Sequence, residues 1–388
     1  MRNVLSDKIV NIEPSGIRKF FDIVSEMPEA ISLGVGEPDF DTPWKIREEG
    51  IYSLERGRTF YTSNSGLLEL RKVICDYSRR KYHLDYSEKE CLVTIGGSEA
   101  IDIAFRAILN PGDEVIVVQP CFVSYAPCVI LAGGTPVYLN LSVENEFKLT
   151  REDLENVITD KTKAIIMAYP NNPTGAIMTK DELEPIADLI KEKDLVVLSD
   201  EIYSELTYGC SHTSIASFPG MKERSIVING FSKAFAMTGW RLGYALAPRN
   251  IMEQMIKIHQ FAIMAAPTTS QYAAIQAMTE CDNEVEEMRD SYNQRRRYLL
   301  KAFQRMSLEC FEAKGAFYMF PSIKEFGMSS DEFATRLLEE EELAVVPGSA
   351  FGECGEGFIR ISYAYSINEL KEALTRMDRF ITRLREKK

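Results

Sequence analysis

The chain has 388 residues, with 45 Lys and Arg against 58 Asp and Glu, so its formal net charge is −13. Its 45% hydrophobic and 27% charged residues are typical of an ordinary globular protein, which excludes a collagen-like or disordered chain. The acidic balance argues against a nucleic-acid-binding surface, because such a surface needs clustered Lys and Arg. At roughly 100–200 residues per domain, this length predicts two or three folding units.

Membrane and export signals are missing from the sequence. No apolar run approaches the roughly 18–20 residues that cross a bilayer, and the N-terminus has no signal-peptide pattern. Eight cysteines are scattered without a C-x-x-C pair, which indicates reduced thiols and not a disulfide framework or a zinc site. These features predict a cytosolic protein that contacts no membrane.

Short apolar runs recur from residue 92 to residue 229. They lack clean alternation, which indicates strands covered on both faces. The predicted strands are residues 92–95, 114–118, 135–139, 164–168, 195–199 and 225–229. Helical patterns lie between several of them, including 100–109 and 181–193, the latter behind a Thr179–Glu182 capping-box pattern. This alternation predicts an α/β fold with a mainly parallel, doubly wound sheet.

The pattern changes beyond about residue 271. A long charged helical stretch at 283–305 is followed by residues 315–321, another helix and residues 343–347, which together predict a smaller α+β domain. We expect residues 45–280 to form the large domain and 281–388 the small one. Residues 1–44 are expected to join the small domain.

Candidate site residues follow the predicted strands, since ligands of such sheets bind beyond the carboxyl ends of the strands. Gly96 and Gly97 follow the first strand and open a helix, a pattern that suits a phosphate but is also common in turns. Asp200 follows the fifth strand, where a carboxylate can cap a helix or bind a metal. The chain has only three histidines, none close to another in sequence, which argues against a metal.

Lys233 follows the sixth strand among small and apolar neighbours. A lysine in such a loop is usually a solvated charge, but burial would favour the neutral amine, which forms Schiff bases. Arg241, eight residues on, carries the fork that binds a dianionic phosphate. A phosphate cradle, a carboxylate and a lysine are the set that a pyridoxal phosphate (PLP) enzyme requires.

Four motifs extend this pattern over nearly the whole chain: residues 33–40 (LGVGEPDF), 169–175 (YPNNPTG), 230–243 around Lys233, and 357–362 (GFIRIS). Their order resembles the class I and II PLP-dependent aminotransferases. The resemblance implies fold type I of the PLP enzymes, in which helices wrap the mainly parallel mixed sheet of a large domain beside a smaller α+β domain. Residues 15–20 and 200–208 are most similar to bacterial N-acetyl-diaminopimelate and aspartate-type aminotransferases.

The resemblance implies an enzyme that moves an amino group between an L-amino acid and a 2-oxo acid by a ping-pong mechanism. Acidic, acylated-diamino and aromatic amino acids are all possible substrates. Lys233 would form the Schiff base with PLP and carry the proton. Asp200 would keep the pyridine nitrogen protonated. Tyr203 and Asn172 would hydrogen-bond the ring oxygen, and Phe122 would stack on the ring.

The resemblance also assigns binding residues. The cofactor phosphate would be held by Gly97, Ser98, Glu99 and Arg241. Arg360 would clamp the substrate α-carboxylate, with Gly36 and Asn172 beside it. Tyr61 would reach the cofactor phosphate of the partner subunit, so the active sites would be shared in a homodimer. Arg18 is a candidate for binding a distal carboxylate, and a surface position beside Lys19 is an equal alternative.

Two positions depart from the family pattern. Gly230 stands where many members have a Ser or Thr that bonds phosphate, so one contact is missing or comes from the backbone. Phe122 stands where relatives often have Trp or Tyr, which keeps the stacking but removes a polar group. Alternative functions on the same fold are a carbon–sulfur β-lyase, an elimination like that of ACC synthase, and a non-catalytic effector module, although the last needs an N-terminal DNA-binding extension.

Overall fold

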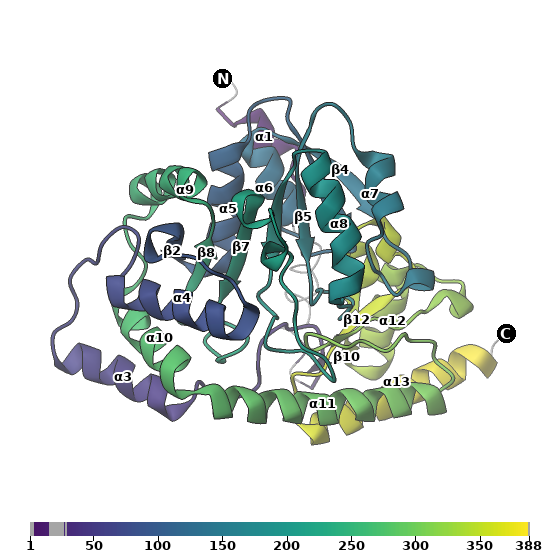
Figure 1. The fold of residues 1–388 in the computed structure, drawn as a ribbon. Helices are drawn as coiled ribbons and strands as arrows, with labels where there is room; N and C mark the ends of the chain where they lie inside the picture. Colours follow the sequence, from purple (N-terminus) through teal and green to yellow (C-terminus); the bar gives the residue numbers. More distant parts are fainter. Residues whose placement is uncertain (1–3, 15–26, 28, 387–388) are drawn as a thin grey trace.

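A seven-stranded sheet is the centre of the computed structural model, which describes residues 4–14, 27 and 29–386 (Figure 1). The strand order is β2-β8-β7-β6-β5-β3-β4. All neighbouring strands are parallel except β8, which runs antiparallel to both β2 and β7. The strands are β2 (Cys91–Thr94), β3 (Glu114–Gln119), β4 (Thr135–Asn140), β5 (Thr162–Ala168), β6 (Val196–Asp200), β7 (Ser225–Gly230) and β8 (Gly243–Leu246).

The predicted α/β class with a mainly parallel mixed sheet is confirmed. Each of the six predicted strands overlaps an observed strand, β2 to β7. The prediction omitted β8, because its four residues follow the Lys233 motif with no helix between them to separate a new strand. The mixed sheet therefore results from one inserted antiparallel strand.

Helices cover both faces of the sheet, which explains the continuous apolar runs. In β3, Val115 and Val117 pack in one cluster with α5 (Gly96–Ile108) and α9 (Arg249–Ala262), while Ile116 and Val118 pack in another with α8 (Lys180–Glu192). The predicted capping box of α8 is present, with the Thr179 hydroxyl and the Glu182 carboxylate each accepting the other residue's backbone N–H. The remaining helices around the sheet are α1 (Asp7–Val10), α3 (Trp44–Glu55), α4 (Leu68–Tyr82), α6 (Tyr125–Ala132), α7 (Arg151–Val157) and α10 (Thr268–Glu280).

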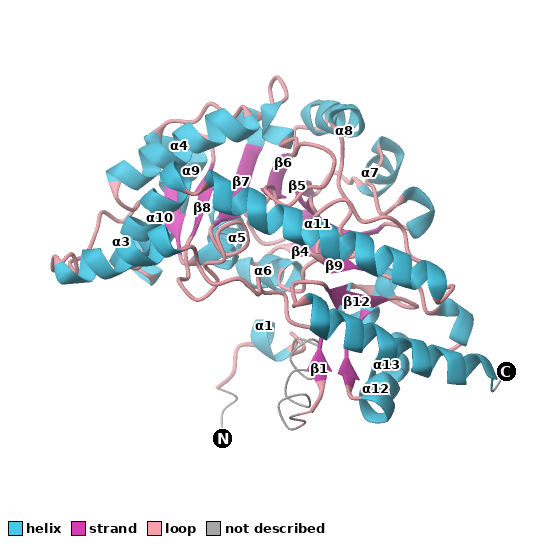
Figure 2. Cartoon of the chain, turned by 90° about the horizontal axis from the view of Figure 1, so that it is seen from below, coloured by secondary structure: helices cyan, strands magenta, loops and turns pink. Residues whose placement is uncertain are grey.

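The C-terminal part of the chain builds two smaller sheets under long helices. Strands β11, β12 and β9 form an antiparallel sheet, and β10 pairs in parallel with β1, which comes from the opposite end of the chain. The long helices α11 and α13 lie side by side (Figures 1 and 2). These elements are β1 (Ile31–Ser32), α11 (Asp282–Arg305), β9 (Tyr318–Met319), α12 (Ser330–Glu341), β10 (Leu343–Ala344), β11 (Val346–Pro347), β12 (Ile359–Ser362) and α13 (Ile367–Glu386).

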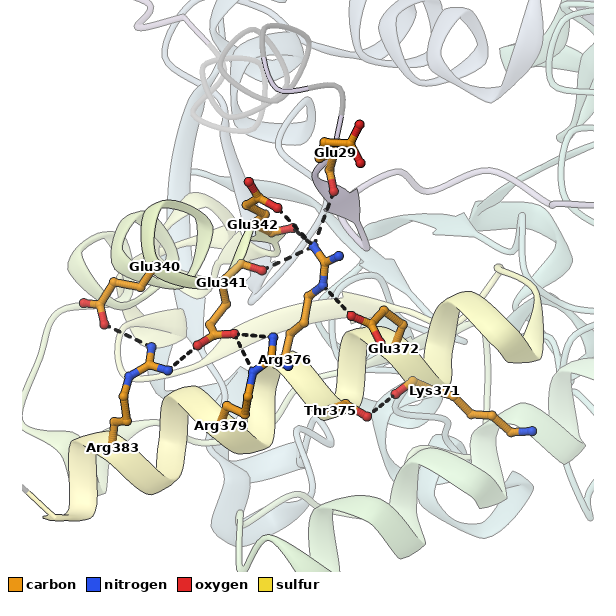
Figure 3. Close-up of polar contacts among 10 residues, drawn as sticks. All are labelled: Glu29, Glu340, Glu341, Glu342, Lys371, Glu372, Thr375, Arg376, Arg379 and Arg383. Carbon is orange, nitrogen blue, oxygen red and sulfur yellow. Dashed lines mark hydrogen bonds and ion pairs between the residues drawn. The ribbon is translucent and has the colours of Figure 1, made fainter.

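Arginines of α13 bind the end of α12 (Figure 3). The buried Glu341 carboxylate accepts hydrogen bonds from Arg379, at 2.7 and 3.0 Å, and from Arg383. Arg376 donates to the backbone carbonyls of Glu341 and Glu342, and also to that of Glu29, which lies just before β1. This network, residues 341–342 with three arginines of α13, therefore connects both ends of the chain.

The described helices include none with the length and apolar composition that a membrane crossing requires. All eight cysteines are free thiols. Four of them are buried, namely Cys75, Cys91, Cys121 and Cys281, so they act as small apolar side chains of the interior.

Candidate active site

A cavity of about 350 Å³ opens at the carboxyl edge of the large sheet, where β2, β5, β6 and β7 all end. Parallel strands bring their carboxyl ends to one edge, so residues far apart in sequence meet there. The cavity is lined by most of the predicted site residues: Gly36, Gly97, Ser98, Phe122, Asn172, Asp200, Tyr203, Lys233, Arg241 and Arg360.

Two predicted residues in the described part of the chain, Tyr61 and Glu99, do not line this cavity, and Arg18 lies outside the described residues. Tyr61 is 83% exposed on the surface of the chain. Glu99 lies in the first turn of α5 beside the cavity, but its carboxylate accepts a hydrogen bond from the Ile95 backbone N–H, at 2.5 Å, and pairs with the buried His259 at 2.6 Å. Only the backbone of Glu99 is therefore left to face a phosphate.

The half-buried Lys233 side chain lines the cavity wall. Its ammonium group donates to the Gly36 carbonyl at 2.5 Å and lies about 6 Å from the rings of Tyr203 and Phe317. Burial lowers the pKa of Lys233 to about 8, and the nearby charges of Arg360 and Arg241 act in the same direction against the opposing carboxylates. The amine is therefore available in its neutral, nucleophilic form near neutral pH.

Asp200 lies at the end of β6 in the wall of the cavity. Burial raises the pKa of this carboxyl above its ordinary value. Two donors oppose that effect: the Tyr125 hydroxyl, at 2.6 Å, and the Ile202 backbone N–H, at 3.2 Å. The carboxylate is thus fixed in orientation by hydrogen bonds before any ligand binds.

Arg360 enters the cavity from β12 and is 3% exposed. Its guanidinium donates to the Asn172 side-chain oxygen at 2.9 Å and to the Gly34 carbonyl at 2.5 Å. Its Nε is buried with no hydrogen-bond partner among the described residues. Since buried donors are almost always paired, this orphaned N–H indicates a missing acceptor such as a carboxylate.

Close backbone packing shapes the phosphate cradle at the start of α5. Gly96 has a φ of +74°, and a Cβ atom there would lie 2.9 Å from the Arg241 guanidinium. A Cβ atom on Gly243, in β8, would lie 2.6 Å from the Gly96 carbonyl carbon. A side chain at Gly230 would also be crowded, with Gly243 and Ile202 at 3.0 Å. The missing Ser or Thr at position 230 therefore follows from the tight contact of β7 with β8, while the Ser232 side chain lines the cavity nearby.

Sequence reasoning missed several residues of the cavity. Tyr125 donates to Asp200, and Tyr318 lies 2.7 Å from the Tyr203 hydroxyl. Glu37 and Ser232 also line the cavity. Glu37 and Ser232 lie within the quoted motifs, so their positions could have been noticed. Tyr125 and Tyr318 lie outside them and reach the site only through tertiary packing.

The donor set suits PLP. A helix N-terminus with an arginine is a site for a phosphate, and a buried carboxylate fits the pyridine nitrogen. An amine with a lowered pKa fits the aldehyde carbon, and an arginine with an unpaired N–H fits a substrate carboxylate. All four groups lie around one cavity.

Comparison with known proteins identifies the family. Residues 28–377 match the family described as aminotransferase class I and II. YugH of Bacillus subtilis, a protein named as an aminotransferase, is 53% identical over 98% of this chain and 99% of its own. An aspartate aminotransferase of Pyrococcus abyssi is 47% identical over 99% of both chains. A Bacillus subtilis protein named as an N-acetyl-LL-diaminopimelate aminotransferase is 43% identical, over 100% of this chain and 98% of its own.

Solved structures of aminotransferases support the same family. An aromatic aminotransferase of Pyrococcus horikoshii OT3 superimposes with a TM-score of 0.90 at 46% identity, covering 94% of this chain and 99% of its own. The aspartate aminotransferase of Thermus thermophilus with maleate gives a TM-score of 0.93 at 37% identity, covering 98% and 100%. The chain therefore belongs to the class I and II aminotransferases, PLP-dependent enzymes that transfer an amino group between an amino acid and a 2-oxo acid.

Proposed function

We propose that the cavity at the carboxyl edge of the sheet is the active site and that Lys233 carries the cofactor. The observation that carries the proposal is that Lys233, Asp200 and Arg360 meet around one cavity although they come from three different parts of the chain. The start of α5 and Arg241 would hold the phosphate: the donors would be the backbone of Gly97, Ser98 and Glu99, the Ser98 side chain and the Arg241 guanidinium.

PLP, when bound, supplies an aldehyde that condenses with amines and a ring that withdraws electrons from the substrate Cα. The Asp200 carboxylate would hold the proton on the ring nitrogen, and Tyr125 would keep that carboxylate charged and oriented. Tyr203 and Asn172 would donate hydrogen bonds to the ring oxygen, and Phe122 would cover one face of the ring. The neutral amine of Lys233 would take the proton from the substrate Cα, which its lowered pKa favours.

Arg360 binds the substrate α-carboxylate through its unpaired Nε and one of its terminal nitrogens. The bonds from Arg360 to Asn172 and Gly34 hold the guanidinium plane in place before the substrate arrives. Gly36 lies at the same end of the cavity and leaves room for the carboxylate beside the backbone. Because both partners in a transamination carry this carboxylate, one arginine serves the amino acid and the 2-oxo acid.

The substrate pocket favours an aromatic or apolar amino donor. Beyond the residues with assigned roles, the described wall of the cavity contains the apolar Val35, Ile101 and Ile202 and the ring of Tyr318, beside the polar Glu37, Ser232 and Thr238. The aromatic aminotransferase among the solved structures supports this choice. For the alternative, a dicarboxylic donor, Arg18 is the candidate for binding the distal carboxylate. If Arg18→Ala leaves the relative activity on glutamate, aspartate and alanine unchanged, that assignment is wrong.

A homodimer with shared active sites is supported by an exposed apolar surface. Phe60, Tyr61 and Phe261 are each more than 80% exposed, and the loop that carries the first two is bonded to residues 264–268. Single folded chains rarely leave several neighbouring aromatic rings in water. In the dimer this surface is covered, and Tyr61 reaches the phosphate of the partner's cofactor.

The same features support a proposal for the domain organisation and the cellular compartment. We propose a two-domain enzyme of amino acid biosynthesis in the cytosol, with residues 45–280 as the large domain and residues 281–388, joined by 1–44, as the small one. The pairing of β1 with β10 and the separate core under α11, α12 and α13 support this division. The eight free cysteines support a reducing compartment.

The direct test is spectroscopic and chemical. The purified protein should absorb in the visible as a lysine-bound cofactor, and amino acids should convert that absorbance to the pyridoxamine form. Lys233→Ala should abolish covalent attachment and turnover, and retained turnover would exclude this mechanism. Pyruvate and ammonia released without any 2-oxo acid would instead identify a β-lyase.

A further inference from the structure

Tyr318 is a cavity residue with no role in the assignment above. It lies in β9, is 1% exposed, and lines the cavity beside Lys233 and Arg360. Its hydroxyl oxygen lies 2.7 Å from that of Tyr203, which is hydrogen-bond distance. The two rings meet edge to face, with centroids 5.7 Å apart. The residue therefore contacts the tyrosine that is assigned to the cofactor's ring oxygen.

The face of the same ring lies against the carboxylate clamp. The Arg360 guanidinium carbon lies 4.5 Å from the Tyr318 ring centroid, a cation–π distance. On the edge of the ring, a Cβ atom added to Gly36 would lie 2.3 Å from the Tyr318 hydroxyl oxygen. The backbone of Gly36 thus confines the hydroxyl, and Gly36 in turn accepts the hydrogen bond of Lys233. Tyr318 is fixed on both sides.

The direction of the bond between the two hydroxyls follows from proton counting. Each tyrosine has one hydroxyl proton to donate. If Tyr203 gives its proton to the cofactor's ring oxygen, it has none for Tyr318, and the 2.7 Å bond must be donated by Tyr318. A hydroxyl that accepts a hydrogen bond becomes a stronger donor, since such chains polarise one another. Tyr318 would then strengthen the bond that Tyr203 makes.

We propose that Tyr318 is a positioning residue with two separable roles: its hydroxyl donates to Tyr203 and strengthens the Tyr203 bond to the ring oxygen, and its ring supports Arg360. The proposal rests on the proposed role of Tyr203. Tyr318 would thus link Tyr203, which bonds the cofactor's ring oxygen, to Arg360, which binds the substrate carboxylate. Loss of the hydroxyl and loss of the ring should therefore have different effects.

The hydroxyl is tested by Tyr318→Phe in the PLP-loaded enzyme. A weaker bond from Tyr203 stabilises the negative ring oxygen less, so the bound cofactor should keep its proton to higher pH. We expect the midpoint of its visible absorbance titration to rise by about half a pH unit. The control is Tyr363→Phe, which removes a buried hydroxyl that donates to the Ala316 carbonyl at 3.0 Å and does not line the cavity. The control should leave the midpoint unchanged.

A double variant separates this inference from the role of Tyr203. Tyr203→Phe should raise the midpoint more than Tyr318→Phe, and adding Tyr318→Phe to it should have no further effect. A midpoint unmoved by Tyr318→Phe but raised by Tyr203→Phe would overturn the inference alone. If the shifts of the two single variants instead add up in the double variant, the inference is also overturned, because Tyr318 would then act independently of Tyr203. A midpoint unmoved by Tyr203→Phe would refute the proposed role of Tyr203, and the inference with it.

The ring is tested by comparing Tyr318→Phe with Tyr318→Leu. Phenylalanine keeps the aromatic face under Arg360, so the KM for the amino donor should stay within about twofold of the original value. Leucine removes it and should raise that KM about tenfold. Both variants must first bind one PLP per chain, which excludes misfolding. Equal KM values in the two variants would show that the ring does not support Arg360.

Discussion

Asp200 shows how two opposing effects set the charge of one buried carboxyl. Burial raises its pKa, and the hydrogen bonds from Tyr125 and the Ile202 backbone lower it again without cancelling the effect of burial. A carboxyl with a raised pKa loses its charge at a higher pH than an ordinary aspartate. The ability of Asp200 to hold a cationic pyridine ring therefore depends on the Tyr125 hydroxyl.

Tyr125→Phe removes that hydroxyl, so the pKa of Asp200 should rise further. We expect kcat to fall about tenfold, the size of one lost hydrogen bond to a charged group, and the acidic limb of the kcat–pH profile to move to higher pH. Steady-state kinetics across the acidic range measure both effects. Tyr86→Phe, at a buried position that does not line the cavity, is the control. An acidic limb that stays in place would contradict the role of Tyr125.

At this scale the sequence predicted the residues that carry recognisable chemistry. Lys233, Asp200 and Arg360 lie in motifs, and the cavity does bring them together. Tyr318 and Tyr125 could not be predicted, because they reach the site from positions 115 and 75 residues away from their partners. No local pattern distinguishes a tyrosine that donates into a site from one that fills the core.

At the scale of single elements, the first turn of α5 supplies the backbone of the predicted phosphate cradle. Glu99 binds the Ile95 backbone N–H at the turn into the helix and pairs with His259 of α9. The Glu99 carboxylate thus holds the backbone of the predicted phosphate cradle in place. A glutamine at position 99 can still accept the Ile95 N–H through its one oxygen, but its neutral amide bonds His259 more weakly than a carboxylate does.

Glu99→Gln should therefore raise the dissociation constant of PLP about tenfold, since the bond to His259 is weakened and the cradle is less ordered. Fluorescence titration of the cofactor-free protein with PLP measures this constant. Glu90→Gln is the matched control, because Glu90 bonds the Ser87 backbone N–H in a similar way but does not line the cavity. An unchanged dissociation constant for Glu99→Gln would show that the cradle does not need this carboxylate.

The contact of α12 with α13 predicts a pH-dependent stability. Burial alone would raise the pKa of Glu341, but the hydrogen bonds from Arg383 and Arg379 hold it below its ordinary value. A carboxyl with a depressed folded-state pKa stabilises the protein above its unfolded-state pKa. That contribution disappears as the pH falls through the folded-state pKa.

Glu341→Gln should lower the free energy of unfolding by about 2 kcal/mol at neutral pH, the value of hydrogen bonds to a buried charge. The difference from the original protein should begin to shrink below about pH 4, where the unfolded chain takes up the proton, and should disappear once the pH falls below the depressed folded-state pKa. Denaturant unfolding at several pH values measures it. Glu339→Gln, an exposed position on the same helix, should change little at any pH. A constant difference down to low pH would contradict the charge-based explanation.

Elements with strong local patterns were predicted, and those defined by long-range pairing were not. The long apolar runs of β3 and β5 and the charged length of α11 were recognised because each pattern is complete within its own segment. The pairing of β1 with β10 joins two-residue strands more than 300 positions apart. Residues 343–347 were recognised as part of the small domain, but such short strands carry no periodicity, so only the folded chain reveals their pairing.

The whole molecule exposes an apolar surface that predicts its assembly. Phe60 and Phe261 are more than 80% exposed, so Phe60→Glu and Phe261→Glu should convert the proposed dimer to a monomer by placing charge in its interface. Analytical ultracentrifugation gives the mass. Tyr138→Glu, at another exposed aromatic residue on β4, should keep the original mass. A monomeric original protein would refute the shared active site.

β8, the one antiparallel strand of the large sheet, also sets the order in which this sheet can be completed while the chain is synthesised. β2 joins the sheet only through β8, which emerges about 150 residues later, and Gly243 of β8 packs directly on the Gly96 backbone. A nascent chain that ends before Gly243 has β7 as an open edge and β2 without a partner. The phosphate cradle is therefore completed only when β8 joins β7 and β2, so a chain that binds PLP has this second-to-edge strand in place.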